Sequence, residues 1–197
     1  MGSAELLAAG LVKPEDTGLF VGNIRKEAAR LLTLIDDIIR LSQLDEGAAL
    51  PTEEVELTAL CEEVVDALGA ARTEDVTIAV SGEPCTVHGV RRLLYEIVYN
   101  LCDNAIKYNI PGGRVDVSVK KEDGHCVLTV ADTGIGISAE HLDRIFERFY
   151  RVDKSHSKQS GGTGLGLSIV KHAVQHHNAK LAVKSTLGKG TTIQVIF

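Results

Sequence analysis

Residues 161–171 read GGTGLGLSIVK, which places four glycines within six positions directly before an apolar, helix-like run. Because glycine has no side chain, it lets backbone N–H groups approach an anion closely, and a helix N-terminus carries about half a positive charge. The stretch therefore favours a phosphate-binding loop at the start of a helix. A flexible loop before an ordinary helix is the alternative, and the stretch alone leaves both open.

A second polar signal lies on the helix expected over residues 90–108. Asn100 and Asn104 are four positions apart and share one face of that helix. Lys107 continues this face, and Glu96 lies one turn earlier. The flanking residues are apolar, so the helix is expected to be mostly buried, where an amide costs free energy unless it is satisfied. Two amides there suit Mg²⁺, which takes its other ligands from water and phosphates. A polar stripe along the helix edge is the alternative.

The third signal follows the strand expected over residues 125–131. That strand ends at Asp132, and Gly134 and Gly136 come next. An aspartate fixed at a strand end can accept a hydrogen bond from an exocyclic amine such as that of adenine, and the glycines leave room for a flat ring. An ordinary Asp-x-Gly turn is the alternative.

The polar tract over residues 155–160 lies between aromatic residues and the glycines. Phe146 and Phe149, three positions apart, are expected to pin the base of a mobile lid that this tract forms. A disordered surface loop is the competing interpretation.

The bulk composition excludes several classes of protein. The chain has 197 residues and a formal net charge of −6, which argues against a general nucleic-acid binder. No apolar run approaches the ~20 residues that would span a bilayer. The four cysteines are widely spaced, which favours buried, reduced thiols over zinc ligands or disulfides.

Hydrophobic periodicity predicts an α/β (α+β) two-layer sandwich with helices on one face, because helices alternate with strands that arrive partly as hairpins. A helical segment over residues 1–47 and a polar linker over 48–54 are expected to precede a domain over 55–197. The expected helices are 4–12, 20–46, 55–68, 90–108, 139–145 and 165–177, and the expected strands are 76–80, 114–120, 125–131, 180–185 and 191–197.

The helix expected over residues 20–46 carries an apolar seam with a period of 3.5 residues. Its members are Ile24, Ala28, Leu31, Ile35 and Ile38. Such a seam is typical of a helical hairpin or coiled coil that packs on a partner helix. A core helix of a single globular domain is the alternative.

Taken together and in order, these segments resemble the ATP-binding catalytic domain of bacterial sensor histidine kinases. NLCDNAIKY (100–108) resembles the N box, DTGIG (132–136) the first glycine box, FERFYR (146–151) the F box and GGTGLGL (161–167) the second glycine box. Residues 24–47 are similar to the second helix of that family's dimerisation and phosphotransfer hairpin. Four ordered boxes are far more specific than one glycine motif. The resemblance implies a mixed sheet, preceded by a partial helical hairpin.

The resemblance also implies roles for individual residues. Asp132 would bind the adenine amine, Asn100 and Asn104 would meet Mg²⁺ and the phosphates, and Arg151 would contact the γ-phosphate. Lys107 would lie near phosphate and Tyr108 beside the base. The remaining implied nucleotide-binding residues are Gly134, Gly136, Gly162, Thr163, Gly164, Leu165 and Gly166.

In this family ATP phosphorylates a histidine, which passes the group to an aspartate of a response regulator. ATP-hydrolysing members of the superfamily place a glutamate at the position of Asn100, and an amide cannot take a proton from water. Asn100 therefore favours transfer to a protein acceptor, with Asn100 and Arg151 as the implied catalytic residues.

The family's phosphoacceptor histidine has a characteristic context that none of the seven histidines here shares. The resemblance thus implies an acceptor upstream of this fragment, and a chain that binds ATP or ADP without autophosphorylating. It implies a cytoplasmic fragment of a membrane-anchored sensor, with homodimerisation through the hairpin and no contact with nucleic acid or membrane by the fragment itself. A nucleotide-sensing module without phosphotransfer, or a serine kinase of the anti-sigma type, is the alternative.

Overall fold

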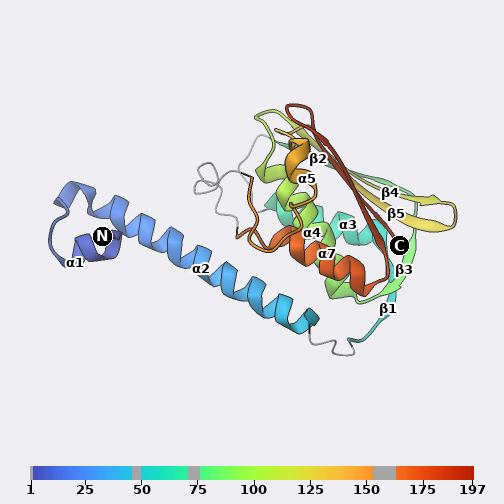
Figure 1. Cartoon of the computed structure of the whole chain (residues 1–197), viewed down its shortest axis with the longest axis horizontal. Coiled ribbons are helices and arrows are strands. Elements are labelled where there is room, and N and C mark those ends of the chain that lie inside the picture. Colours follow the sequence, from blue (N-terminus) through green and yellow to red (C-terminus); the bar gives the residue numbers. More distant parts are fainter. Residues whose placement is uncertain (1, 46–49, 71–75, 153–162) are drawn as a thin grey trace.

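The computed structural model describes residues 2–45, 50–70, 76–152 and 163–197, and it contains a five-stranded sheet with helices packed on one face (Figure 1). The strands lie in the order β2–β4–β5–β7–β6. Strand β2 is parallel to β4, and all other neighbours in this sheet are antiparallel. The expected two-layer sandwich with a mixed sheet is confirmed. Its strands are β2 (Thr77–Gly82), β4 (Arg114–Glu122), β5 (His125–Asp132), β6 (Lys180–Thr186) and β7 (Gly190–Ile196).

Three helices cover the inner face of this sheet. They are α3 (Leu57–Ala70), α4 (Arg91–Lys107) and α7 (Gly166–His176). Helix α4 is central because it contacts α3, α7, β4 and β5. Its apolar face is fully buried, with Leu93, Leu94 and Ile97 at 0% exposure. The sheet side chains alternate as expected for a sheet with one buried face, since Val115 and Val117 are buried while Asp116 is partly exposed.

The N-terminal part is helical, as expected. It contains α1 (Ser3–Ala8), a short 3₁₀ turn (Pro14–Asp16) and the 29-residue helix α2 (Thr17–Asp45). Helix α2 contacts α7, while its N-terminal half extends away from the sheet (Figure 1). The apolar seam stays exposed in the single chain, with Leu31 at 47%, Ile35 at 52% and Ile38 at 46%. The short α5 (Ala139–Leu142) lies within the expected 139–145 helix.

Two short strands differ from the sequence prediction. Residues 53–56 form β1 (Glu53–Glu56), which pairs antiparallel with β3 (Thr86–Gly89). The expected linker over 48–54 therefore overlaps the start of β1, and the helix expected from residue 55 begins only at Leu57. Glutamate-rich segments have good helix propensity, and here the pairing with β3 overrides it.

Glu56 explains why α3 starts where it does. Its carboxylate accepts hydrogen bonds from the backbone N–H groups of Thr58 (2.9 Å) and Ala59 (2.6 Å), which are among the donors that a helix N-terminus leaves unsatisfied. It also accepts one from Cys85 N at 3.1 Å. Burial by itself would raise the pKa of Glu56, but these backbone donors outweigh it and the pKa is lowered.

The expectation of four reduced thiols is wrong for one pair. Cys85 and Cys126 form a disulfide across 41 positions of sequence, because the residue before β3 and the start of β5 lie together in the fold. Cys61 and Cys102 are buried thiols that take no part in a disulfide, as expected. Burial raises the pKa of the Cys61 thiol to about 12, so it stays protonated near neutral pH.

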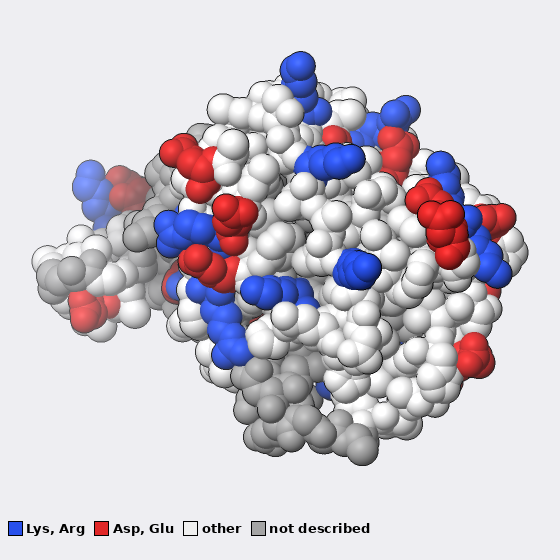
Figure 2. Space-filling view, turned by 45° about the vertical axis from the view of Figure 1, so that its right-hand side comes forward, with Lys and Arg blue, Asp and Glu red and all other residues white. Residues whose placement is uncertain are grey.

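The surface carries charges of both signs. In the view of Figure 2, Lys and Arg side chains are interspersed with acidic side chains, and uncharged side chains cover most of the face between them. Within the described parts of the chain, no helix is both long and apolar enough to cross a bilayer.

Candidate functional site

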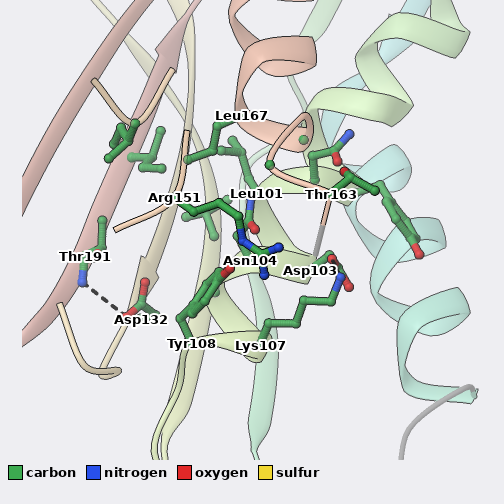
Figure 3. A pocket seen from close by; sticks show the side chains of 18 of the residues that line it. Leu101, Asp103, Asn104, Lys107, Tyr108, Asp132, Arg151, Thr163, Leu167 and Thr191 are labelled. Carbon is green, nitrogen blue, oxygen red and sulfur yellow. Dashed lines mark hydrogen bonds and ion pairs between the residues drawn. The ribbon is translucent and has the colours of Figure 1, made fainter. Parts of the chain in front are cut away.

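A cavity of about 750 Å³ opens between α4, the end of β5 and the loop that leads into α7 (Figure 3). Its size falls within the range of small-molecule sites. Polar side chains from segments far apart in the sequence line it, and its apolar walls include Val130, Ile137 and Ile193. The cavity therefore combines a mostly apolar surface with a few placed polar groups.

Asn100 and Asn104 face this cavity from α4. The Nδ2 group of Asn100 donates to the backbone oxygen of Glu96 at 2.8 Å, which fixes the amide orientation. A Cβ at position 166 would lie 2.7 Å from Asn100 Oδ1, so any other residue there would have to displace the Asn100 amide. The start of α7 can therefore approach α4 closely, as the glycine-rich sequence predicts.

Asp132 lies at the end of β5, where the sequence places it, and lines the cavity (Figure 3). Its Oδ1 atom accepts hydrogen bonds from Gly134 N (2.8 Å) and Thr191 N (3.2 Å). Burial raises the pKa of Asp132, although the two backbone donors oppose that shift. Both of these hydrogen bonds end on Oδ1, so a ligand in the cavity can use Oδ2 as its acceptor.

The end of α4 is joined to the loop after β5. Tyr108 O accepts a hydrogen bond from Ile135 N at 3.0 Å. A Cβ at Gly134 would lie 2.3 Å from the same oxygen, so this glycine permits the close approach. Tyr108, at 40% exposure, is thus held at the cavity mouth beside Asp132 (Figure 3).

Lys107 and Arg151 supply positive charge to the cavity. Lys107 forms an ion pair with Asp103, one turn earlier on α4, with Nζ 2.5 Å from Oδ2. Arg151 is the last residue of the F box, and its side chain reaches into the cavity (Figure 3).

The loop before α7 is fixed by its backbone. Gly164 has φ of 76°, a conformation that favours glycine, and its oxygen accepts a hydrogen bond from Phe149 N at 3.0 Å. Phe149 itself is 58% exposed. The backbone of Phe149 therefore contacts the loop before α7. That Phe146 and Phe149 pin the base of a lid stays a prediction. The lid tract over residues 155–160 lies outside the described residues.

Most of the residues singled out from the sequence meet in this one cavity. Gly134 and Leu165 are not among the lining residues. Leu165 is fully buried against Ile169 and Leu34. Gly162 lies outside the described residues. The expected site residues that line the cavity are Asn100, Asn104, Lys107, Tyr108, Asp132, Gly136, Arg151, Thr163, Gly164 and Gly166.

Several residues that line the cavity are not predicted from the sequence. Thr191 contacts Asp132 because β7 pairs with β5. No local sequence pattern predicts this contact. Thr33 and Asp37 line the cavity from α2. Asp37 interrupts the apolar run over residues 31–39, which is the one signal that could have revealed it.

Comparisons with known proteins identify the class. Residues 89–197 match the family described as histidine kinase-, DNA gyrase B- and HSP90-like ATPases. The chain is 36% identical over 193 residues to the sensor-like histidine kinase SenX3 of Mycolicibacterium smegmatis, which covers 96% of this chain and 50% of SenX3. The solved structure of the mycobacterial sensor histidine kinase MprB is 33% identical, with a TM-score of 0.66 over 75% of this chain and 97% of MprB. Full-length ShkA, crystallised in complex with AMPPNP, is 26% identical, with a TM-score of 0.74 over 94% of this chain and 39% of ShkA.

The chain belongs to the histidine kinase-, DNA gyrase B- and HSP90-like ATPase family. Its relatives are sensor histidine kinases, so it carries the ATP-binding catalytic domain of that group of protein-histidine kinases. The chain spans about half the length of SenX3.

Proposed function

We propose that this chain binds Mg-ATP in the cavity and donates the γ-phosphoryl group to a histidine on a dimerisation hairpin, for relay to a response-regulator aspartate. The observation that carries the proposal is the convergence of Asn104, Asp132 and Gly164 on one cavity from three separated segments. The similarity of this chain to ShkA, which was crystallised in complex with AMPPNP, supports an adenine nucleotide as the ligand.

The two ends of the cavity suit the two ends of ATP. We assign the adenine amine to Asp132 Oδ2, with the ring beside Tyr108. We assign the phosphates to the start of α7, where Gly164 and Gly166 leave backbone N–H groups accessible and the helix end is positive. Arg151 is assigned to the γ-phosphate, because a guanidinium group can donate two parallel hydrogen bonds to phosphate oxygens.

The residues present fit Mg²⁺. Within the described residues there is no cluster of three or more His, Cys, Asp or Glu side chains that could form a protein cage. Mg²⁺ typically takes few protein ligands and completes its shell with phosphates and water. Because Asn100 Nδ2 is held by Glu96 O, Asn100 Oδ1 is available as a neutral oxygen ligand, and Asn104 offers a second amide on the same face.

The chemistry then depends on positioning and on neutralising charge, not on a nucleophile from this domain. When bound, Mg²⁺ supplies part of that neutralisation at the phosphate oxygens. Asn100 cannot deprotonate water. This property supports transfer to a protein over hydrolysis.

The exposed seam of α2 supports homodimerisation of the intact protein, since Leu31, Ile35 and Ile38 form an unpaired apolar stripe on the single chain. We further propose that the parent is a membrane-anchored sensor, with this part on the cytoplasmic side, because the relatives are named as sensors.

A transfer assay tests the proposal. The chain is mixed with a separate hairpin bearing a phosphoacceptor histidine and with γ-labelled Mg-ATP. We expect acid-labile, alkali-stable label on the hairpin and none on this chain. The Asn104→Ala variant is expected to abolish the signal while remaining folded by circular dichroism. Release of labelled inorganic phosphate without labelled hairpin would contradict the proposal and favour an ATPase.

A further inference from the structure

Helix α2 contributes to the wall of the nucleotide cavity. Thr33 and Asp37, four positions apart on α2, both line it. Between them Leu34 packs against the buried Leu165 and Ile169 at the start of α7. We call these contacts of Leu34 and Asp37 with the start of α7 the α2 latch.

The polar part of the α2 latch is centred on Thr163. Its hydroxyl donates to Asp37 Oδ2 at 2.7 Å. Thr163 Oγ1 in turn accepts a hydrogen bond from the backbone N–H of Leu165 at 3.3 Å. Thr163 thus connects a carboxylate of α2 to a backbone donor directly before α7.

That backbone donor belongs to the set expected to bind phosphate. A nucleotide phosphate at the start of α7 would compete with Thr163 Oγ1 for the Leu165 N–H. The carboxylate of Asp37 also brings a negative charge into the cavity, where it repels a triphosphate. Arg92 and Arg151 line the same cavity. Asp37 and the phosphates would therefore compete for the positive charges of these two side chains.

We propose that the α2 latch and Mg-ATP oppose each other: the latch lowers nucleotide affinity, and the β- and γ-phosphates release α2 from the catalytic unit. The inference rests on the proposed nucleotide site. Linkage requires the two effects to be equal, so the factor by which the latch weakens ATP is also the factor by which ATP weakens the latch.

Three variants test this in the full chain, with Mg-AMPPNP binding measured by calorimetry. Asp37→Ala removes both the charge and the acceptor, and should tighten Mg-AMPPNP by about 5- to 150-fold, the usual range of coupling between sites. Asp37→Asn keeps an acceptor for Thr163 but removes the charge, and should give a smaller gain. Leu34→Ala weakens the apolar contact and should also tighten binding.

Two controls make the test specific. Leu31→Ala, one turn earlier on α2 at a position that is 47% exposed, should leave binding unchanged. AMP lacks the β- and γ-phosphates, so its affinity should be the same for the wild type and for Asp37→Ala.

A distance measurement gives an independent readout. Dyes placed through Val21→Cys on α2 and Leu187→Cys on the β6–β7 turn, both exposed positions, should report a changed transfer efficiency with Mg-AMPPNP and none with AMP.

The outcomes separate the two proposals. If Mg-AMPPNP binds the wild type and Asp37→Ala equally, or binds the variant more weakly, the latch is overturned while the nucleotide site stands. If neither protein binds any adenine nucleotide, the proposed function fails and the latch fails with it.

Discussion

Replacing Asp132 by asparagine should separate adenine recognition from folding. The asparagine Oδ1 can still accept the hydrogen bonds from Gly134 N and Thr191 N that Asp132 Oδ1 accepts. Its Nδ2 group replaces Oδ2, and a donor then faces the amine of adenine. The substitution therefore removes one ligand contact and keeps the two structural ones.

The expected size follows from the type of bond. A hydrogen bond to a charged group contributes about 1.5–3 kcal/mol, or roughly 10- to 150-fold in Kd. Asp132 is only partly buried, so we expect a value near the lower end. Stability should not fall near neutral pH, because the variant no longer has to bury a charge.

The sign of the pH dependence adds a second check. The folded-state pKa of Asp132 is raised above the ordinary value of 3.8. The folded wild type therefore binds the proton more readily than the unfolded chain, and this contribution to stability is present at low pH and lost as pH rises through the folded pKa. Relative to Asp132→Asn, the wild type should gain stability as pH falls through that window.

The assay compares ATP with inosine triphosphate, which lacks the exocyclic amine, by calorimetry with Mg²⁺ present. The wild type should prefer ATP, and Asp132→Asn should lose that preference while keeping a cooperative unfolding transition. If the folded variant retained the full preference for ATP, the assignment of Asp132 to the adenine amine would be refuted.

Three further predictions concern stability, each measured by urea unfolding. The Cys85→Ala, Cys126→Ala double variant should lose up to about 4 kcal/mol, as loop closure over 41 positions implies, and an unchanged midpoint would show that the bridge does not constrain the chain. Glu56→Ala should lower the free energy of unfolding by about 1 kcal/mol through loss of the α3 cap. This difference in stability from the wild type should disappear as pH falls through the lowered pKa of Glu56. A difference that stays constant with pH would exclude the carboxylate as its source. Burial lowers the pKa of His177, whose Nε2 accepts from Val90 N, so the wild type should lose stability as pH falls below 6.5, and His177→Gln should flatten that slope.

The sequence predicted those parts of the site whose geometry is local. Asn100 and Asn104 share a face because helical periodicity requires it, and Asp132 sits at a strand end because alternation and the following glycines define that end. Pairing between strands far apart in the chain could not be predicted from local sequence patterns. Thr191, for example, contacts Asp132 only because of the register between β5 and β7. The Cys85–Cys126 bridge likewise depends on the placement of β3 beside β5 and not on any spacing pattern.

Helix α2 illustrates a different limit. Its apolar seam predicts the helix correctly, but the face of α2 toward the cavity depends on contacts with Thr163 and the start of α7. Leu34 and Asp37 stand inside a run whose dominant signal is the 3.5-residue repeat. The strong seam pattern therefore hides the few positions of α2 that contact the start of α7.

The backbone hydrogen bond from Ile135 N to Tyr108 O joins the end of α4 to the loop after β5 at 3.0 Å, and Gly188 N continues the chain of bonds to Ile135 O at 2.7 Å. The end of the cavity assigned to the base is thereby fixed to the sheet, whereas the end assigned to the phosphates is formed by a loop that also contacts α2. Under the proposed function, this division would let an incoming signal change how the triphosphate is bound while selectivity for the purine stays constant.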